Sequence, residues 1–72
     1  MADKLTKSII FSLSEEFEKA VFRSRKRPRD IIRALPTLHP EVFSNPNEWV
    51  NLNQNTRNVI LTRIRRTLNS LS

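Results

Sequence analysis

The sequence predicts a mostly α-helical domain, with three to five short helices around one small core and a candidate β-strand near the N-terminus. Its 72 residues match the size of one small domain, so we treat 1–72 as a single domain. Apolar residues recur at helical spacing through most of the chain. Prolines stand where helices would begin or end.

Residues 5–13 carry the alternating pattern that predicts a strand over 5–11. One side of this pattern contains Leu5, Ile9, Phe11 and Leu13, and the other contains Thr6, Ser8 and Ser12. No second alternating run is present to pair with it. The segment is therefore a strand that pairs with another molecule, an extended arm on the helices, or an early start to the first helix. Our candidates for protein contacts are Leu5, Ile9, Ile10 and Phe11.

The first helix is predicted over 14–26. Ser12 or Ser14 can cap it, because a hydroxyl accepts a bond from a free amide at the helix start. One face contains Leu13, Phe17, Ala20, Val21 and Ser24. Phe22 points the other way, and we expect it to pack under a neighbouring segment. The alternative is an exposed ring beside arginines, which would stack on a base or insert into a partner protein.

A second helix is predicted over 28–35. Pro28 suits its first turn, where a missing amide costs nothing, and Asp30 lies near the same positive end. Its buried face contains Ile31, Leu35 and Ile32, and its outward face contains Arg29 and Arg33. Like charges four residues apart repel each other, and an anion between them relieves the repulsion. Pro36 is expected to end this helix.

The middle of the chain is predicted to form short turns, with a helix over 46–52 that begins at Asn45 and Pro46. Its core residues are expected to be Val42, Phe43, Trp49, Val50 and Leu52. His39 has no partners for metal or acid–base chemistry, so we expect a structural role. The chain has no glycine, so left-handed helix ends are expected to use asparagine, and the candidates are Asn51, Asn53 and Asn55.

The last helix is predicted over 56–71, with Asn55 or Thr56 as its cap. Its apolar stripe contains Ile60, Leu61, Ile64, Leu68 and Leu71. Opposite them lie Val59, Arg63, Arg66 and Ser70, with Thr62 and Asn69 alongside. Arginines around a small apolar side chain are typical of a helix that reads the major groove of DNA. An ordinary solvated face is the alternative.

The charge distribution favours a polyanionic partner. The net charge is +6, and residues 34–56 contain only Glu41 and Glu48 as formal charges, so the cations form two separate groups. We expect both groups to converge on one side of the folded molecule and to bind nucleic acid, DNA rather than RNA. The alternative is that they only keep the protein soluble. The candidate nucleic-acid-binding residues are Arg23, Arg25, Lys26, Arg27, Arg29, Arg33, Arg63 and Arg66.

Other function classes have little support in the sequence. Cysteine, tyrosine and glycine are absent, and one histidine is present, so no catalytic set or phosphate-binding loop is recognisable. We expect no enzyme activity, no metal and no cofactor. Without cysteines or a long apolar segment, a cytoplasmic protein with no membrane contact is expected. The oligomeric state is left open between monomer and homodimer.

Residues 8–35, SIIFSLSEEFEKAVFRSRKRPRDIIRAL, resemble the ribbon-helix-helix family of DNA-binding proteins. In that family a strand from each of two subunits enters the major groove, and two helices form the dimer core. The resemblance implies that Ser8, Ile10 and Ser12 face the groove and that Arg29 lies near phosphate.

The opening MADKLTKSIIFSLSEEFEKAVF, together with the basic run, also resembles small phage-encoded proteins that regulate host RNA polymerase. This resemblance implies a bacterial host cell, an N-terminal segment that adds to a polymerase surface, and cations along the nearby nucleic acid. The function that we predict is therefore a small basic transcription regulator that binds nucleic acid. The alternative is a protein-interaction module that binds RNA polymerase and alters transcription initiation or termination.

Overall fold

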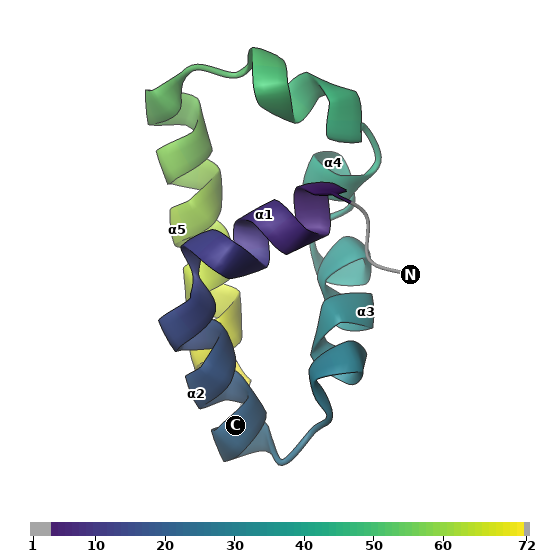
Figure 1. Cartoon of the computed structure of the whole chain (residues 1–72), viewed down its shortest axis with the longest axis vertical. Helices are drawn as coiled ribbons and strands as arrows, with labels where there is room; N and C mark the ends of the chain where they lie inside the picture. Colours follow the sequence, from purple (N-terminus) through teal and green to yellow (C-terminus); the bar gives the residue numbers. More distant parts are fainter. Residues whose placement is uncertain (1–3, 72) are drawn as a thin grey trace.

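The computed structural model describes residues 4–71, which form five α-helices and one 3₁₀ helix (Figure 1). In chain order these are α1 (Lys4–Ser12), α2 (Ser14–Ser24), α3 (Pro28–Leu38), α4 (Pro40–Phe43), η1 (Pro46–Asn51) and α5 (Gln54–Ser70). No strand occurs within this part of the chain. The mostly α fold class is confirmed, with one more helical segment than the largest number predicted.

The strand predicted over 5–11 is wrong, because these residues form α1. The alternative of an early helix start is correct: Leu5, Ile9 and Leu13 are four residues apart, so they share one helical face, and all are buried. The chain bends at Leu13, whose amide still donates to the carbonyl of Ile9 at 3.0 Å. Since α1 leads directly into α2, the predicted hydroxyl cap at Ser12 or Ser14 is not formed.

Helix α3 continues through Pro36 to Leu38, so the predicted stop at Pro36 is wrong. A proline inside a helix removes one backbone hydrogen bond. Here the loss falls in the last turn, and the helix still closes with the His39 amide donating to the carbonyl of Leu35 at 2.8 Å. Helix α2 is shorter than predicted, because it ends at Ser24 rather than at residue 26.

The segment between α3 and α5 is fixed by side chains rather than by a large buried surface. His39 is buried, and its Nε2 lies 2.7 Å from Oγ1 of Thr67 on α5. The guanidinium of Arg57 donates to the carbonyls of Trp49 (3.1 Å) and Val50 (2.9 Å). Val50, which was predicted to lie in the core, is 71% exposed, because the 3₁₀ turn directs it outward.

The predicted caps of this region are only partly correct. Asn45 precedes η1 as expected, but its side chain donates to Glu48 (3.1 Å) rather than capping the backbone. Asn53, rather than Asn55 or Thr56, caps α5, by accepting from the amide of Thr56 at 2.8 Å. None of the asparagines proposed for a left-handed conformation adopts it among residues 4–71.

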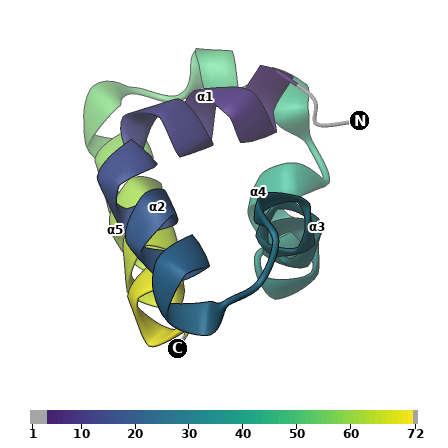
Figure 2. The ribbon, with the colours of Figure 1, turned by 60° about the horizontal axis from the view of Figure 1, so that its bottom comes forward.

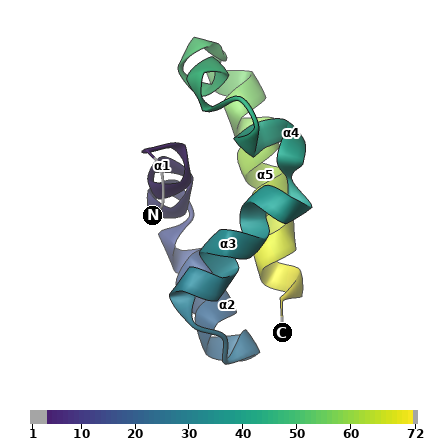
Figure 3. The ribbon, with the colours of Figure 1, turned by 90° about the vertical axis from the view of Figure 1, so that its right-hand side faces the viewer.

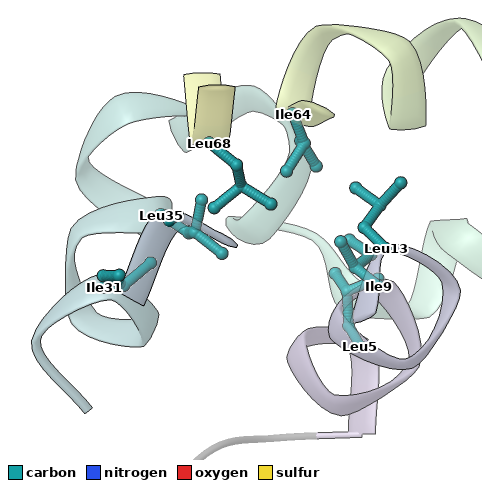
Figure 4. Packing of buried hydrophobic residues seen from close by; sticks show 8 residues of the cluster. Leu5, Ile9, Leu13, Ile31, Leu35, Ile64 and Leu68 are labelled. Atoms are coloured by element: carbon teal, nitrogen blue, oxygen red, sulfur yellow. The ribbon is translucent and has the colours of Figure 1, made fainter. Parts of the chain in front are cut away.

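The core brings together side chains from α1, α2, α3 and α5. Its buried apolar residues are Leu5, Ile9, Leu13, Ala20, Ile31, Leu35, Ile64 and Leu68. Leu68 points toward Leu35 of α3, and Ile64 points toward Leu13, so α5 connects the two sides of the core (Figure 4). The apolar faces predicted for α2, α3 and α5 are therefore confirmed. Every buried side-chain nitrogen and oxygen within the described residues has a hydrogen-bond partner.

The arrangement of α2, α3 and α5 positions the candidate site. Helices α2 and α5 pack against each other and run in the same direction, from the top toward the bottom of Figure 1. In all three ribbon views α5 ends near the last turn of α2 and the turn that leads into α3 (Figures 2 and 3). We call this part of the molecule the basic end, and the opposite part, formed by α4 and η1, the α4–η1 end.

Candidate nucleic-acid interface

The turn between α2 and α3, residues 25–27, consists entirely of cations. Arg25 adopts the left-handed conformation, with φ 58°, and its amide donates to the carbonyl of Val21 at 3.1 Å. This geometry ends α2, and glycine is the usual residue for it because a Cβ atom makes the conformation unfavourable. Position 25 therefore carries a cation although glycine would fit this backbone conformation better.

The remainder of the turn is held by local contacts. The amide of Lys26 donates to Oγ of Ser24 at 3.2 Å. Arg27 is extended and immediately precedes Pro28, whose ring fixes φ at the start of α3. The turn therefore holds its three side chains on a defined backbone, all of them exposed to solvent.

Two further predicted cations, Arg29 and Arg33, lie on the exposed side of α3, four residues apart as the sequence indicated. Arg29 stands in the first turn of the helix, where the macrodipole favours a negative charge and disfavours a cation. Asp30 occupies the same turn and offsets part of this effect. The helix itself thus provides no reason for an arginine at position 29.

Arg23 has a structural explanation that Arg29 lacks. It stands in the last turn of α2, where the negative end of the macrodipole stabilises a cation. It also lies seven residues after Glu16, which places both on the same face of α2. Since Glu16 pairs with Arg65 on α5 at 3.3 Å, Arg23 lies on the side of α2 that borders α5.

Arg63 and Arg66 are exposed on α5, on the face opposite the buried Ile64 and Leu68. The predicted face also included Ser70, with Thr62 alongside. The hydroxyl of Thr62 donates to the carbonyl of Asn58, and that of Ser70 donates to the carbonyl of Thr67, both at 2.8 Å. These donors are already used within the helix.

The structure therefore groups the predicted cations unevenly. Those of residues 23–29 lie together at the basic end, and Arg33 lies one helical turn further along α3. Arg63 and Arg66 belong to the half of α5 that approaches this end, and both are exposed. None of the eight predicted side chains forms an ion pair with a carboxylate of residues 4–71.

Sequence reasoning placed Phe22 incorrectly. It was expected to pack under a neighbouring segment, but its side chain is 85% exposed. Helical spacing in the sequence places Phe22 on the side of α2 away from Phe17 and Ala20, and this spacing could have indicated its exposure. No element of residues 4–71 covers this face of α2, so the ring is free at the edge of the cationic turn.

The residues predicted for protein contacts are mostly used by the core. Leu5 and Ile9 are buried and Ile10 is half-buried, whereas Phe11 is 85% exposed. A cavity of about 490 Å³ lies between the start of α1 and η1. Its lining consists of Lys4, Leu5, Ser8, Pro46, Asn47, Trp49 and Val50.

Other kinds of site are not apparent in the described part of the chain. Residues 4–71 contain no cluster of three or more His, Asp or Glu side chains that could hold a metal ion. Among their helices, none combines the length and the apolar character needed to cross a membrane. No protein-family model matches the chain, and neither a curated protein nor a solved structure matches it significantly.

Proposed function

We propose that this chain is a small nucleic-acid-binding regulator of transcription that contacts phosphates through its basic end. Arg23, Arg25, Lys26, Arg27 and Arg29 supply the main contacts in this proposal. Arg33, Arg63 and Arg66 extend the same positive surface along α3 and α5. Arginine and lysine side chains that are not paired with carboxylates can neutralise phosphates and release the counterions bound to them.

One observation carries the proposal: cations occupy positions that the fold itself disfavours. Arg25 stands at a positive φ angle, and Arg29 stands at the positive end of α3. A requirement for solubility alone could be met by cations elsewhere on the surface, with glycine at position 25 and a carboxylate at position 29. Binding of an anion at this end explains both choices.

The ribbon-helix-helix resemblance does not enter this proposal. Ser8, Ile10 and Ser12, which it would place on a strand in the major groove, belong to α1. The proposed contacts come from the ends of helices and from the turn between them.

The first test is the salt dependence of binding. Fluorescence anisotropy with a labelled DNA duplex should give a log affinity that falls linearly with log salt, by about 0.9 per neutralised phosphate. Four phosphate contacts would give a slope of about −3.6. A slope near zero, or no binding of duplex or single-stranded nucleic acid at low salt, would contradict the proposal.

The second test uses two charge-reversal variants with the same change in net charge. Arg25→Glu combined with Lys26→Glu should weaken binding by about 100-fold or more, because each lost charged contact is worth about 1.5–3 kcal/mol. The control combines Lys4→Glu with Lys7→Glu, both exposed on α1 away from the turn. Equal losses in the two variants would show that net charge, rather than the basic end, determines binding.

The alternative function, a module that binds RNA polymerase, has one structural feature in its favour. The cavity beside α1 is bordered by Leu5, Trp49 and Val50, and Val50 is largely exposed. An apolar side chain of a protein partner could enter it. Binding of the purified polymerase, with no affinity for nucleic acid at low salt, would favour this alternative.

A further inference from the structure

Phe22 is exposed where the chain leaves α2 for the cationic turn. Its side chain is 85% exposed, whereas Phe17 and Phe43 pack against the core. A single exposed apolar residue is common on protein surfaces and by itself implies nothing. The position of Phe22 is informative because Arg23, Arg25 and Lys26 follow it directly.

The backbone around the ring is well defined. Phe22 belongs to the last turn of α2, and the amide of Arg25 closes that turn on the carbonyl of Val21. The amide of Lys26 is fixed by Ser24. The backbone positions that carry the ring and the following cations are therefore fixed relative to each other, which lowers the entropic cost of binding a ligand that contacts both.

The charges before and after Phe22 in the sequence differ in sign, so a phosphate chain is favoured on only one side of the ring. One turn earlier along α2 stand Glu18, which is exposed, and Lys19, which pairs with Glu15 at 3.2 Å. A phosphate chain would be repelled on the Glu18 side and attracted on the side of the turn. A nucleic acid that contacts Arg25 and Lys26 would thus present its neighbouring groups to the ring.

An exposed ring beside phosphate contacts suits an unpaired base. Aromatic side chains that stack on successive bases, next to cations that follow the backbone, are the usual means of binding single strands. In a duplex the faces of the bases are covered by their neighbours, so a protein ring reaches them only by wedging between base pairs and unstacking them. The ring of Phe22 would therefore contribute to binding of single strands and little to binding of intact duplex.

We propose that the basic end binds single-stranded nucleic acid, with an unpaired base stacked on Phe22 and the adjacent phosphates on Arg23, Arg25 and Lys26. This inference rests on the proposed function and specifies its ligand. DNA and RNA share the required chemistry, a base with a π face and a phosphate backbone. Separate binding measurements with each strand distinguish them.

The experiment measures the affinity of the full chain for labelled strands of about 12 nucleotides, within the range of single-strand site sizes. The probes are a DNA strand, the RNA strand of the same sequence and the corresponding DNA duplex. Both single strands, or one of them, should bind more tightly than the duplex at the same salt concentration. Equal or tighter binding of the duplex would overturn the inference.

Variants at position 22 test the ring itself. Phe22→Ala should weaken single-strand binding by about tenfold, the order expected for loss of one base stack. Phe22→Trp should retain binding, whereas Phe22→Leu, which is apolar but has no π face, should resemble alanine. The matched control is Phe11→Ala, which removes a ring of the same exposure from α1 and should have no effect.

A nucleic-acid strand with abasic sites tests the same stacking contact by removing the base instead of the ring. Such a strand keeps its phosphates and lacks bases, so wild-type protein should bind it about as weakly as Phe22→Ala binds the normal strand. The variant should bind both strands equally, because the two changes remove the same contact. Additive losses would overturn the inference.

The results separate this inference from the proposed function. The salt slope reports phosphate contacts, so it should be the same for wild type and Phe22→Ala. A steep slope with no effect of Phe22→Ala would overturn the base stack and leave the proposed function intact. No binding of any probe at low salt would overturn both and leave a protein partner as the explanation. A thermal melt of each variant, followed by circular dichroism, establishes that it is folded.

Discussion

The basic end and the α4–η1 end of the molecule both contain exposed or half-buried arginines beside an aromatic ring, but they use them differently. At the α4–η1 end, the guanidinium of Arg57 donates to two backbone carbonyls and lies 5.9 Å from the centre of the Trp49 ring. At the basic end, Arg25 and its neighbours form no ion pair within residues 4–71, and the ring of Phe22 is uncovered. An arginine and an aromatic ring thus stabilise the α4–η1 end, whereas at the basic end both are exposed to solvent.

This difference teaches that an arginine must be assigned from its acceptors rather than from its place in a charge cluster. Arg57 and Arg65 belong to the C-terminal group of cations in the sequence, together with Arg63 and Arg66. Arg57 is committed to the fold and Arg65 to an ion pair with Glu16, whereas Arg63 and Arg66 are not paired with any described carboxylate. Counting charges could not separate these cases.

The largest effect that sharpens the comparison is expected from Arg57→Ala. Removing this guanidinium takes one donor from the carbonyl of Val50 and one from that of Trp49, which keeps the amide of Leu52 at 3.3 Å, and it removes the contact with the Trp49 ring. We expect the free energy of unfolding to fall by about 2 kcal/mol. For a domain of this size that corresponds to a decrease in melting temperature of roughly 8–16 °C.

The matched control is Arg23→Ala, which removes an exposed guanidinium from the basic end. It should change the melting temperature little, apart from the modest loss of a favourable contact with the end of the α2 dipole. Nucleic-acid binding should respond in the opposite way, weakened by Arg23→Ala and unchanged for folded Arg57→Ala. The comparison fails if both variants lose the same stability.

Much of the fold followed from helical periodicity. The apolar faces of α2, α3 and α5 were predicted because each has several residues at spacings that fit only a helix. The N-terminal segment was mistaken for a strand because Leu5, Ile9 and Leu13 are four residues apart, a spacing that suits both a period of two and a period near 3.6. Phe11 alone favoured alternation, and it is exposed.

The site was less predictable, because its geometry depends on contacts between distant segments. The cations were recognisable from composition, but which of them were bound by other residues depended on the packing of α2 on α5 and of η1 near Arg57. The left-handed conformation at Arg25 was also missed, because in a chain without glycine this conformation was expected at Asn51, Asn53 or Asn55. The exposure of Phe22 required knowing that nothing packs on that face of α2.

A smaller effect is expected from Arg25→Gly, which should stabilise the fold and weaken the binding of nucleic acid. Glycine adopts a φ angle of 58° without the steric cost that a Cβ atom brings. We expect the free energy of unfolding to rise by about 0.5–1 kcal/mol, after allowing for the greater freedom of glycine in the unfolded chain. Affinity for nucleic acid should fall, because one phosphate contact is lost.

The control for this variant is Lys26→Gly, at the next position of the turn. It also removes one cation, but Arg25 is the only residue of 4–71 with a positive φ angle, so glycine gains nothing at position 26. Urea unfolding and anisotropy on both variants separate the backbone effect from the charge effect. A destabilised Arg25→Gly would mean that the arginine is retained for the fold.

The smallest effect concerns Arg65, which is intermediate between the arginines bound within the fold and those that are unpaired. Its Nε lies 3.3 Å from Oε1 of Glu16, and both side chains are partly exposed, by 46% and 25%. Ion pairs of this exposure contribute little after solvent screening, so Glu16→Gln should lower the free energy of unfolding by less than about 1 kcal/mol. The released guanidinium lies next to Arg66 in sequence, so affinity for nucleic acid at low salt should rise.

Glu15→Gln is the control, because it removes the same charge one residue earlier and breaks the more exposed pair with Lys19. Lys19 and Arg65 lie on different helices, so only Glu16→Gln adds a free cation to the surface that α5 presents beside Arg63 and Arg66. A rise in affinity that is larger for Glu16→Gln would assign Arg65 to the available cations. If Glu16→Gln instead costs more than about 1 kcal/mol with no gain in affinity, the pair is part of the fold, and Arg65 belongs with Arg57.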